Sequence, residues 1–308
     1  MTARTILCAG ETLWDVLPPG EFIGGAPFNV ASHCARLGAR ALIVTRLGKD
    51  ERGRRALDQA KANGLDLSLL QIDPRLPTGV ARAVLDVAGS ASYEFLRPAA
   101  WDALTATPAA LAAAAAADAF VYGTLGQRDP RSREAIGQLA RAARWRVFDP
   151  NLRAPHIERI LCEAGLRDAG LVKVNEAECA LFAEWFGGEA TPEGLWSTLS
   201  RHFAVQALCV TLGAAGSRLY WRGAWYAQGS VPTAVADTVG AGDAFLAMLV
   251  CELLGGSDAP TGLARAARLA SYVASQSGAV PAYEAARFRS SSVHAQQVML
   301  AADQPVPR

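Results

Sequence analysis

The stretch LVKVNEAECALFAEWF, residues 171–186, passes directly from a short apolar run into a helical pattern. Its first four residues predict a buried strand, and residues 177–186 predict a helix. The same order recurs along the chain. Strands and helices are predicted in alternation at 119–122, 132–143, 146–148, 157–164, 194–202 and 207–211. Short buried strands that alternate with helices are typical of a mostly parallel α/β sheet with helices on both faces.

The segments on either side of this region extend the pattern. Before it, β-rich runs at 81–87 and 91–95 are joined by Ala88-Gly89-Ser90, which predicts a hairpin. Further elements are predicted as strands at 5–9 and 41–44, helices at 28–37, 52–63, 243–254 and 261–275, and a second hairpin over 217–226. No repeat or linker-like composition interrupts the chain. The sequence therefore predicts one doubly wound α/β domain over residues 1–308, with a small β excursion built from N-terminal segments.

Composition excludes several classes of protein. Apolar residues make up 51% of the 308 residues and charged residues 19%, which is not the composition of a disordered chain. Lys and Arg total 30 and Asp and Glu 29, so the formal net charge is +1. A chain with this balance has no overall field that attracts a polyanion, and we expect no nucleic-acid partner.

Cysteine spacing and the N-terminus bear on the compartment. The 6 cysteines are widely separated and the 4 histidines are scattered, which argues against a structural zinc site. Glu11 and Asp15 come too early for a secretory signal. The alanine-rich run 109–117 stops at Asp118, so it predicts a soluble helix rather than a membrane span. We expect a cytoplasmic protein with no membrane partner.

The segment DTVGAGDAF, residues 237–245, is the strongest candidate for chemistry. Its two glycines stand just before an apolar helical run, and the free N–H groups at such a helix start suit a phosphate or a developing oxyanion. Asp243 would lie in the first helical turn beside that anion site. A carboxylate there can take a proton from an attacking hydroxyl. The alternative is that Asp243 only caps the helix.

A second candidate lies near the N-terminus, where GGAPFNVA spans residues 24–31 and Asp15 precedes it. Small residues before Asn29 let a ligand approach the backbone, and Asp15 and Asn29 supply an acceptor and mixed donors for sugar hydroxyls. A helix cap at Asn29 and a turn at Asp15 are the alternatives.

Polar residues also follow three of the predicted strands. Asp149 to Arg153 follow 146–148, Asn175 and Glu178 follow 171–174, and Thr211 to Gly213 end the strand at 207–211. Open α/β sheets bind ligands at the carboxyl ends of their strands. The sequence contains neither a GxxxxGKS/T phosphate loop nor a GxGxxG dinucleotide fingerprint, so the glycine-led helix start is the remaining candidate for holding phosphate.

Taken together, GGAPFNVA, DPNLR, KVNEAE, VTLGAAG and DTVGAGDAF resemble the ribokinase-like family of carbohydrate kinases, in that family's order and over nearly the whole chain. The resemblance implies ATP-dependent phosphorylation of a sugar hydroxyl, with Mg²⁺ as cofactor. It also implies a β-sheet lid formed by roughly residues 11–30 and 79–102, which we expect to close on sugar. An exposed lid edge is open to pairing with a second copy, so a homodimer through the lid is one expectation.

The resemblance assigns roles to residues of this chain. Asp243 corresponds to the general base, and the amides of Gly240, Ala241 and Gly242 correspond to the anion hole. The remaining assignments are Asp15, Gly24, Gly25 and Asn29 as sugar ligands, Asn175 and Glu178 as the motif that positions phosphate and hydrated Mg²⁺, and Thr211, Gly213 and Gly216 along the nucleotide. Asp237 and the loop at 278–279 resemble a monovalent-cation site. Ala282 lacks the hydroxyl that ribokinases often supply there, which leaves K⁺ activation open.

Three segments bear on which sugar accepts the phosphoryl group. GGAP, DPNLR and Ala100-Trp101-Asp102 resemble the fructokinase branch, which implies that fructose is phosphorylated at its 6-hydroxyl. Trp101 is either an apolar wall over the sugar or a buried structural residue. Arg153 and Arg97 are either solvated or salt-bridged, or placed to reach a carboxylate, as in related 2-keto-3-deoxygluconate kinases. Ribose or a nucleoside is a further alternative, and a non-catalytic sugar sensor on the same fold is another. The presence of Asp243 with its glycines argues against the sensor.

Overall fold

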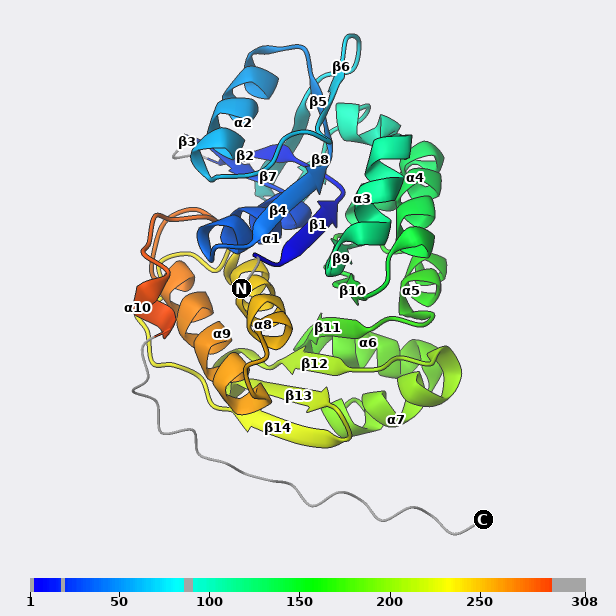
Figure 1. Ribbon diagram of the computed structural model, residues 1–308, viewed down its shortest axis with the longest axis vertical. Helices are drawn as coiled ribbons and strands as arrows, with labels where there is room; N and C mark the ends of the chain where they lie inside the picture. The colour runs from blue at the N-terminus through cyan, green and yellow to red at the C-terminus, as the bar shows by residue number, and fades with distance from the viewer. Residues whose placement is uncertain (1–2, 18–19, 86–90, 290–308) are drawn as a thin grey trace.

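A computed structural model describes residues 3–17, 20–85 and 91–289. In this part of the chain a large sheet of eight strands has the order β14-β13-β12-β11-β10-β9-β1-β4 (Figure 1). Parallel pairing joins six neighbouring strands, namely β4, β1, β9, β10, β11 and β12. β13 and β14 add an antiparallel edge next to β12. Their bounds are β1 Thr5–Ala9, β4 Arg40–Val44, β9 Ala119–Tyr122, β10 Arg146–Phe148, β11 Leu171–Asn175, β12 Leu208–Thr211, β13 Ser217–Trp221 and β14 Ala224–Gln228. The predicted mostly parallel sheet is confirmed.

Helices cover both faces of this sheet (Figure 1). One face carries α1 Ala26–Arg36, α8 Ala241–Gly255 and α9 Ala259–Ala274, and the other carries α3 Pro108–Ala116, α4 Pro130–Ala142, α5 Arg159–Leu166, α6 Glu176–Phe186 and α7 Pro192–Phe203. Successive residues of β1 alternate between the two layers, since Ile6 and Cys8 pack with the first set and Leu7 with the second. Both layers are apolar, which is why the strands are nearly continuous apolar runs in the sequence.

The β excursion predicted from the N-terminal segments is a separate four-stranded sheet, here called the lid, with the order β3-β2-β7-β8. Its strands are β2 Leu13–Leu17, β3 Gly20–Gly24, β7 Gly79–Leu85 and β8 Ala91–Phe95. The predicted hairpin is confirmed by antiparallel pairing of β7 with β8, and its expected turn at residues 88–90 lies outside the described residues. The sheet occupies less of the chain than predicted, because residues 26–30 belong to α1 and residues 100–103 form a short 3₁₀ helix.

Smaller elements join the lid to the large sheet. Helix α2, Glu51–Ala62, packs with Trp14 of the lid, and a two-stranded parallel sheet is formed by β5 Arg46–Gly48 and β6 Gln71–Asp73. Further short helices lie at η1 Ala100–Ala103, η2 Leu125–Gln127, η3 Gly213–Ala215 and α10 Ala286–Arg289. Within the described ranges, no helix combines the length and apolar character needed to cross a bilayer.

The topology brings the candidate residues to one edge. β1, β9, β10, β11 and β12 run in parallel, so their carboxyl ends meet at the same side of the sheet. The lid begins there because β2 follows β1 after three residues, and α8 starts from the loop that returns to this edge. In open α/β sheets this edge is where ligands bind.

Candidate active site

Helix α8 begins at a turn that only glycine can form. Gly240 caps the helix with φ +77°, a left-handed conformation that side chains rarely adopt. A Cβ at this position would also lie 2.6 Å from the Cα of Ala279, so space and backbone conformation both exclude larger residues. This turn fixes the direction in which the first N–H groups of α8 point.

Asp243 is the third residue of that helix and is 8% exposed. Its Oδ2 accepts a hydrogen bond of 2.8 Å from Nδ2 of Asn29, on α1. Burial raises the pKa of Asp243 to about 6, although the hydrogen bond from Asn29 lowers it. Gly240 is the cap and α8 has no side-chain cap hydrogen bond, so the alternative of a mere capping role does not describe this residue. A buried carboxylate that titrates near neutral pH is suited to accept a proton.

The predicted anion hole is only partly free for a ligand. The N–H of Ala241 donates to the carbonyl of Thr238 at 3.3 Å, which closes the turn. The N–H of Gly242 lies in the first turn of α8, before the helix can supply an acceptor four residues back. Gly242 is therefore a better-placed donor than Ala241 for an incoming oxyanion.

A buried ion pair that we did not predict lies behind this helix start. Nζ of Lys173, on β11, is 2.9 Å from Oδ2 of Asp149, which follows β10, and both side chains are under 10% exposed. A Cβ on Gly242 would lie 3.2 Å from Nζ, so the ammonium stands against the start of α8. Burial opposes the charge of Lys173, but Asp149 and Glu178 outweigh it and raise its pKa. A lysine within the apolar run LVKV was the sequence signal for this residue.

The lid contributes Asp15 from β2. On β3, which pairs with β2, a Cβ on Gly24 would lie 2.5 Å from Oδ2 of Asp15, so the glycine leaves room for the carboxylate. Burial raises the pKa of Asp15 to about 6; Arg153 lowers it, and Asp237 and Asp243 raise it. These influences place Asp15 in one electrostatic environment with Asp243.

The GGAP turn is held by a carboxylate that the sequence analysis did not single out. Oε1 of Glu11 accepts a hydrogen bond from the N–H of Ala26 at 3.2 Å, while Oε2 is buried and has no partner in the described chain. Gly25 has φ +109°, and a Cβ at this position would clash with the backbone carbonyl oxygen of Glu11. Burial raises the pKa of Glu11 to about 7.

Trp101, Arg97 and Arg153 have three different environments in the structure. Trp101 is 1% exposed, and the guanidinium of Arg128 lies 3.8 Å from its ring centroid, so protein covers the face predicted for a sugar. Of the two alternatives for Trp101, the structure therefore favours the buried structural residue over a wall of the sugar site. Arg97 pairs with Asp129 at 3.5 Å. Arg153 is exposed and, among the described residues, its guanidinium has no ion-pair or hydrogen-bond partner.

Comparison with known proteins shows the family of this chain. A family model described as pfkB family carbohydrate kinase matches residues 6–286. The chain belongs to the pfkB family of carbohydrate kinases. It is 30% identical over 259 residues to a fructokinase of Klebsiella pneumoniae, covering 79% of this chain and 82% of that protein. It is 28% identical over 248 residues to a 2-dehydro-3-deoxygluconokinase of Thermoproteus tenax, covering 77% and 75% of the two chains.

Solved structures give the same result for this pfkB-family kinase. The crystal structure of a fructokinase with bound ATP from Xylella fastidiosa matches with a TM-score of 0.81 at 25% identity, covering 93% of this chain and 98% of that one. The predicted ribokinase-like fold is confirmed.

The NxxE motif of the kinase forms a capping box at the start of α6. Oδ1 of Asn175 accepts from the N–H of Glu178 at 2.9 Å, and Oε2 of Glu178 accepts from the N–H of Asn175 at 2.9 Å. Oε1 of Glu178 accepts from the N–H of Leu152 at 2.7 Å. Burial and the charge of Asp149 raise the pKa of Glu178.

These residues fit a hydrated Mg²⁺, which prefers carboxylate oxygens and keeps several waters. Oδ1 of Asp149 is buried without a partner among the described atoms, close enough to Glu178 for their charges to interact. They are only two carboxylates, and nowhere in the described ranges, this site included, does a group of three or more His, Cys, Asp or Glu residues gather for a metal ion.

The predicted nucleotide residues lie on the neighbouring strand. Thr211 pairs in register with Asn175 at the carboxyl ends of β12 and β11. Gly213 follows with φ +54°, and a Cβ added there would meet no atom within 4 Å, whereas Gly216 packs tightly against the carbonyl of Gln228. There is therefore open space beside Gly213.

Asp237 is the remaining predicted residue. Its Oδ1 accepts from the N–H of Val239 at 3.0 Å, so the carboxylate braces the turn that leads into α8. Residues 278–279 were predicted to form a monovalent-cation site together with Asp237. Of these two residues, Ala279 packs against Gly240.

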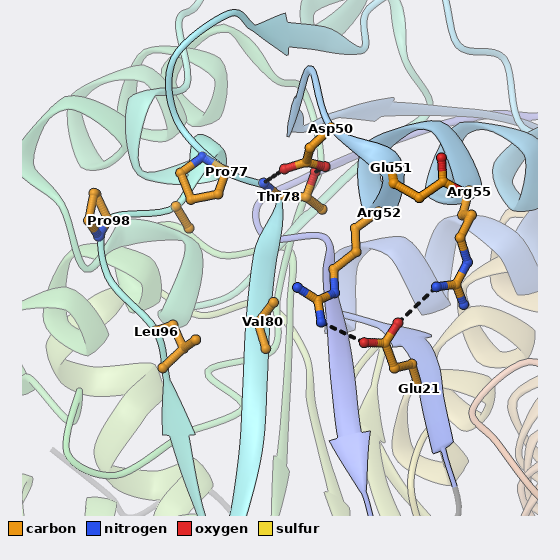
Figure 2. A pocket seen from close by; sticks show the side chains of 11 residues that line it. Glu21, Asp50, Glu51, Arg52, Arg55, Pro77, Thr78, Val80, Leu96 and Pro98 are labelled. Atoms are coloured by element: carbon orange, nitrogen blue, oxygen red, sulfur yellow. Dashed lines mark hydrogen bonds and ion pairs between the residues drawn. The ribbon is translucent and has the colours of Figure 1, made fainter.

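A cavity of about 430 Å³ borders the lid away from these residues (Figure 2). Val80 lines it and pairs with Trp14, so it lies on the opposite face of the lid from Asp15, the next residue of β2. Figure 2 shows Arg52 and Arg55 both directed at Glu21, and Arg55 binds it at 2.8 Å. This cavity is therefore separate from the candidate site.

Proposed function

We propose that this kinase transfers the γ-phosphoryl group of ATP to a primary hydroxyl of a sugar, with D-fructose as acceptor and fructose 6-phosphate as product. The observation that carries the proposal is the buried Asp243 at a glycine-led helix start, bound by Asn29 and in electrostatic contact with Asp15. A hydroxyl bound between the lid and α1 would meet a base and an oxyanion site together.

Each residue has a role in this proposal. Asn29 occupies Oδ2 of Asp243 and leaves Oδ1 to take the hydroxyl proton. Gly242 and Gly240 supply N–H groups to the developing charge, and Lys173 adds a buried positive charge behind them. Phosphoryl transfer depends mainly on positioning and charge neutralisation, which these groups provide.

Mg²⁺ and the nucleotide would occupy the neighbouring strand ends. Asp149 and Glu178 would hold the hydrated ion, which would supply positive charge to neutralise the phosphates. Thr211 pairs with Asn175, and the space beside Gly213 is open, so both residues would lie along the nucleotide. The ATP bound in the fructokinase from Xylella fastidiosa supports this nucleotide.

A sugar acid is the second candidate acceptor, and Arg153 is the observation that favours it. Its guanidinium lacks a partner within the described chain and still lowers the pKa of Asp15, so it is near enough to meet a carboxylate on the sugar. The relative from Thermoproteus tenax acts on such an acid according to its name. Fructose is placed first because several of the similar curated proteins are fructokinases.

The test is an acceptor screen with ATP and Mg²⁺, following ADP release by a coupled assay. Fructose, 2-keto-3-deoxygluconate, ribose and a nucleoside are compared by kcat/KM. A preference of tenfold or more for the acid would overturn fructose. Sugar binding without ADP release for every acceptor would support the non-catalytic sensor instead.

The remaining proposals concern a monovalent cation, a homodimer and lid closure; the ADP-release assay tests the first, and physical measurements test the other two. Replacing KCl by tetramethylammonium chloride tests a monovalent cation at Asp237. Sedimentation of the chain, with and without sugar, tests a homodimer through the lid, and protease sensitivity under both conditions tests lid closure.

A further inference from the structure

Helix α1 carries a buried histidine that has no role in the proposed chemistry. His33 is 0% exposed and lies one turn after Asn29. Its Nε2 is 3.0 Å from the carbonyl oxygen of Ala279, and its Nδ1 is 2.8 Å from the hydroxyl of Tyr283. The two rings stack with centroids 5.7 Å apart. Both polar atoms of the ring are therefore engaged by the segment 279–283.

The partners determine the tautomer. A carbonyl oxygen only accepts, so Nε2 of His33 carries the hydrogen, and Nδ1 accepts from the hydroxyl of Tyr283. Burial lowers the pKa of His33 to about 4, although the hydrogen bond to Ala279 raises it. The ring is thus neutral at physiological pH, and both hydrogen bonds persist there.

Ala279 is the residue against which the anion-hole turn is built. It is 3% exposed, and a Cβ on Gly240 would lie 2.6 Å from its Cα and from its carbonyl oxygen. Neighbouring residues have other anchors, because Arg36 donates to the carbonyl of Pro281 at 3.0 Å and Tyr272 to that of Ala282 at 2.8 Å. The carbonyl of Ala279 itself is bound by His33.

We propose that His33 is a positioning residue of the kinase, and this inference rests on the proposed function. Its Nε2–H fixes the carbonyl of Ala279, and Ala279 sets the Gly240 turn that directs the first N–H groups of α8 at the transferring phosphoryl group. One helix then organises both parts of the machinery. Asn29 orients the base, and His33, four residues later, orients the anion hole.

The test compares two substitutions in the full chain. His33→Leu keeps the bulk of the side chain but removes the donor, whereas His33→Gln keeps an N–H donor at a similar reach. We expect His33→Leu to lower kcat by about tenfold to a hundredfold, since a displacement of about 1 Å in a catalytic site costs up to about a hundredfold. KM for sugar should change less than about twofold, because no sugar contact is lost. His33→Gln should recover most of kcat.

A second readout separates positioning from folding. ADP with aluminium fluoride mimics the transferring phosphoryl group, so His33→Leu should weaken inhibition by this pair while ADP alone binds as before. Tyr283→Phe leaves the bond to Ala279 in place and should keep kcat within about threefold. Leu139→Ala, in the buried core of α4, supplies a matched loss of stability away from the site.

The outcomes are distinct. If His33→Leu lowers Tm but keeps kcat and aluminium fluoride inhibition, or if Leu139→Ala loses kcat equally, the inference is overturned and His33 is only structural. If His33→Leu does not fold, His33→Met, which also lacks a donor, takes its place in the same comparison. A chain that phosphorylates no acceptor overturns the proposed function and this inference together, whereas an active chain with an unaffected variant overturns the inference alone.

Discussion

Asn29 and Asp243 are 214 residues apart in the chain, and their side chains meet in a hydrogen bond of 2.8 Å. The bond joins α1 to α8 at the carboxyl edge of the sheet. It occupies one carboxylate oxygen of the proposed base and opposes the rise in its pKa that burial causes. The two helices thus share control of the group on which the proposed chemistry depends.

Replacing the base tests its role directly. Asp243→Asn keeps the shape and the contact with Asn29 but cannot take a proton, so we expect kcat to fall by about 10²–10⁴-fold, the usual contribution of a general base. Sugar affinity should change little, as measured by calorimetry. Near-normal turnover in this variant would contradict the assignment.

The pH profile provides a second test. Asp243 must be ionised to act as a base and its pKa is raised to about 6, so kcat at saturating sugar should fall as the pH drops through about 6. Asn29→Ala removes the hydrogen bond that lowers this pKa, so the acidic limb should move to higher pH. A limb that stays in place or moves downward in Asn29→Ala would assign the titration to another group, such as Asp15.

Arg153 separates the two candidate acceptors. If the acceptor is fructose, Arg153→Gln should change its KM by less than about threefold, because fructose has no carboxylate. If the acceptor is a sugar acid, the loss of a charge-assisted hydrogen bond worth about 1.5–3 kcal/mol should raise KM by about tenfold or more. Arg97→Gln is the matched control, since Arg97 is bound to Asp129. A tenfold rise in the KM for fructose with Arg153→Gln would contradict the expectation for fructose.

Local patterns predicted the elements of the large sheet because its strands are buried on both faces. LVKV and the runs at 119–122 and 207–211 are apolar throughout apart from Lys173 and Thr211, and helices alternate with them. The strands β5 and β6 were missed because three residues are too few to show alternation. β2 and β3 were missed because a glycine- and proline-rich stretch surrounds them, and because the pairing of β2 with β7 is a contact between distant segments.

The site was predictable residue by residue but not as an arrangement. Asp243, Asn29 and Asp15 stood in recognisable segments, yet the bond between the first two has no signal in either segment. Lys173, Glu11 and His33 were not predicted, because their roles come from burial against partners that only the tertiary structure brings near. For Trp101 the sequence left two alternatives, a wall over the sugar or a buried structural residue. Its packing against Arg128 favours the buried structural residue.

Glu11 makes stability depend on pH. Its folded-state pKa is raised to about 7 from 4.5, so the folded chain holds this proton more tightly than the unfolded chain does. The contribution to stability is full below about pH 4.5 and is lost as the pH rises to about 7. Glu11→Gln keeps an acceptor for Ala26 but does not titrate. Relative to the unsubstituted chain it should therefore gain up to about 3 kcal/mol in unfolding free energy between about pH 4.5 and about pH 8.

Urea denaturation at several pH values measures this difference, and Glu134→Gln, at an exposed position of α4, is the control. Parallel stability curves for Glu11→Gln and the unsubstituted chain would contradict the prediction.

The Lys173–Asp149 pair is best tested by a double-mutant cycle. Lys173→Met leaves the carboxylate of Asp149 buried without its partner, and breaking a buried pair in this way costs about 3–5 kcal/mol. Lys173→Met with Asp149→Asn removes both charges, so the double variant should be more stable than Lys173→Met alone. Both variants should lose kcat, because the positive charge behind Gly242 is absent in each. Additive losses of stability would show instead that the two charges do not depend on each other, and an unchanged kcat in Lys173→Met would remove the lysine from the anion site.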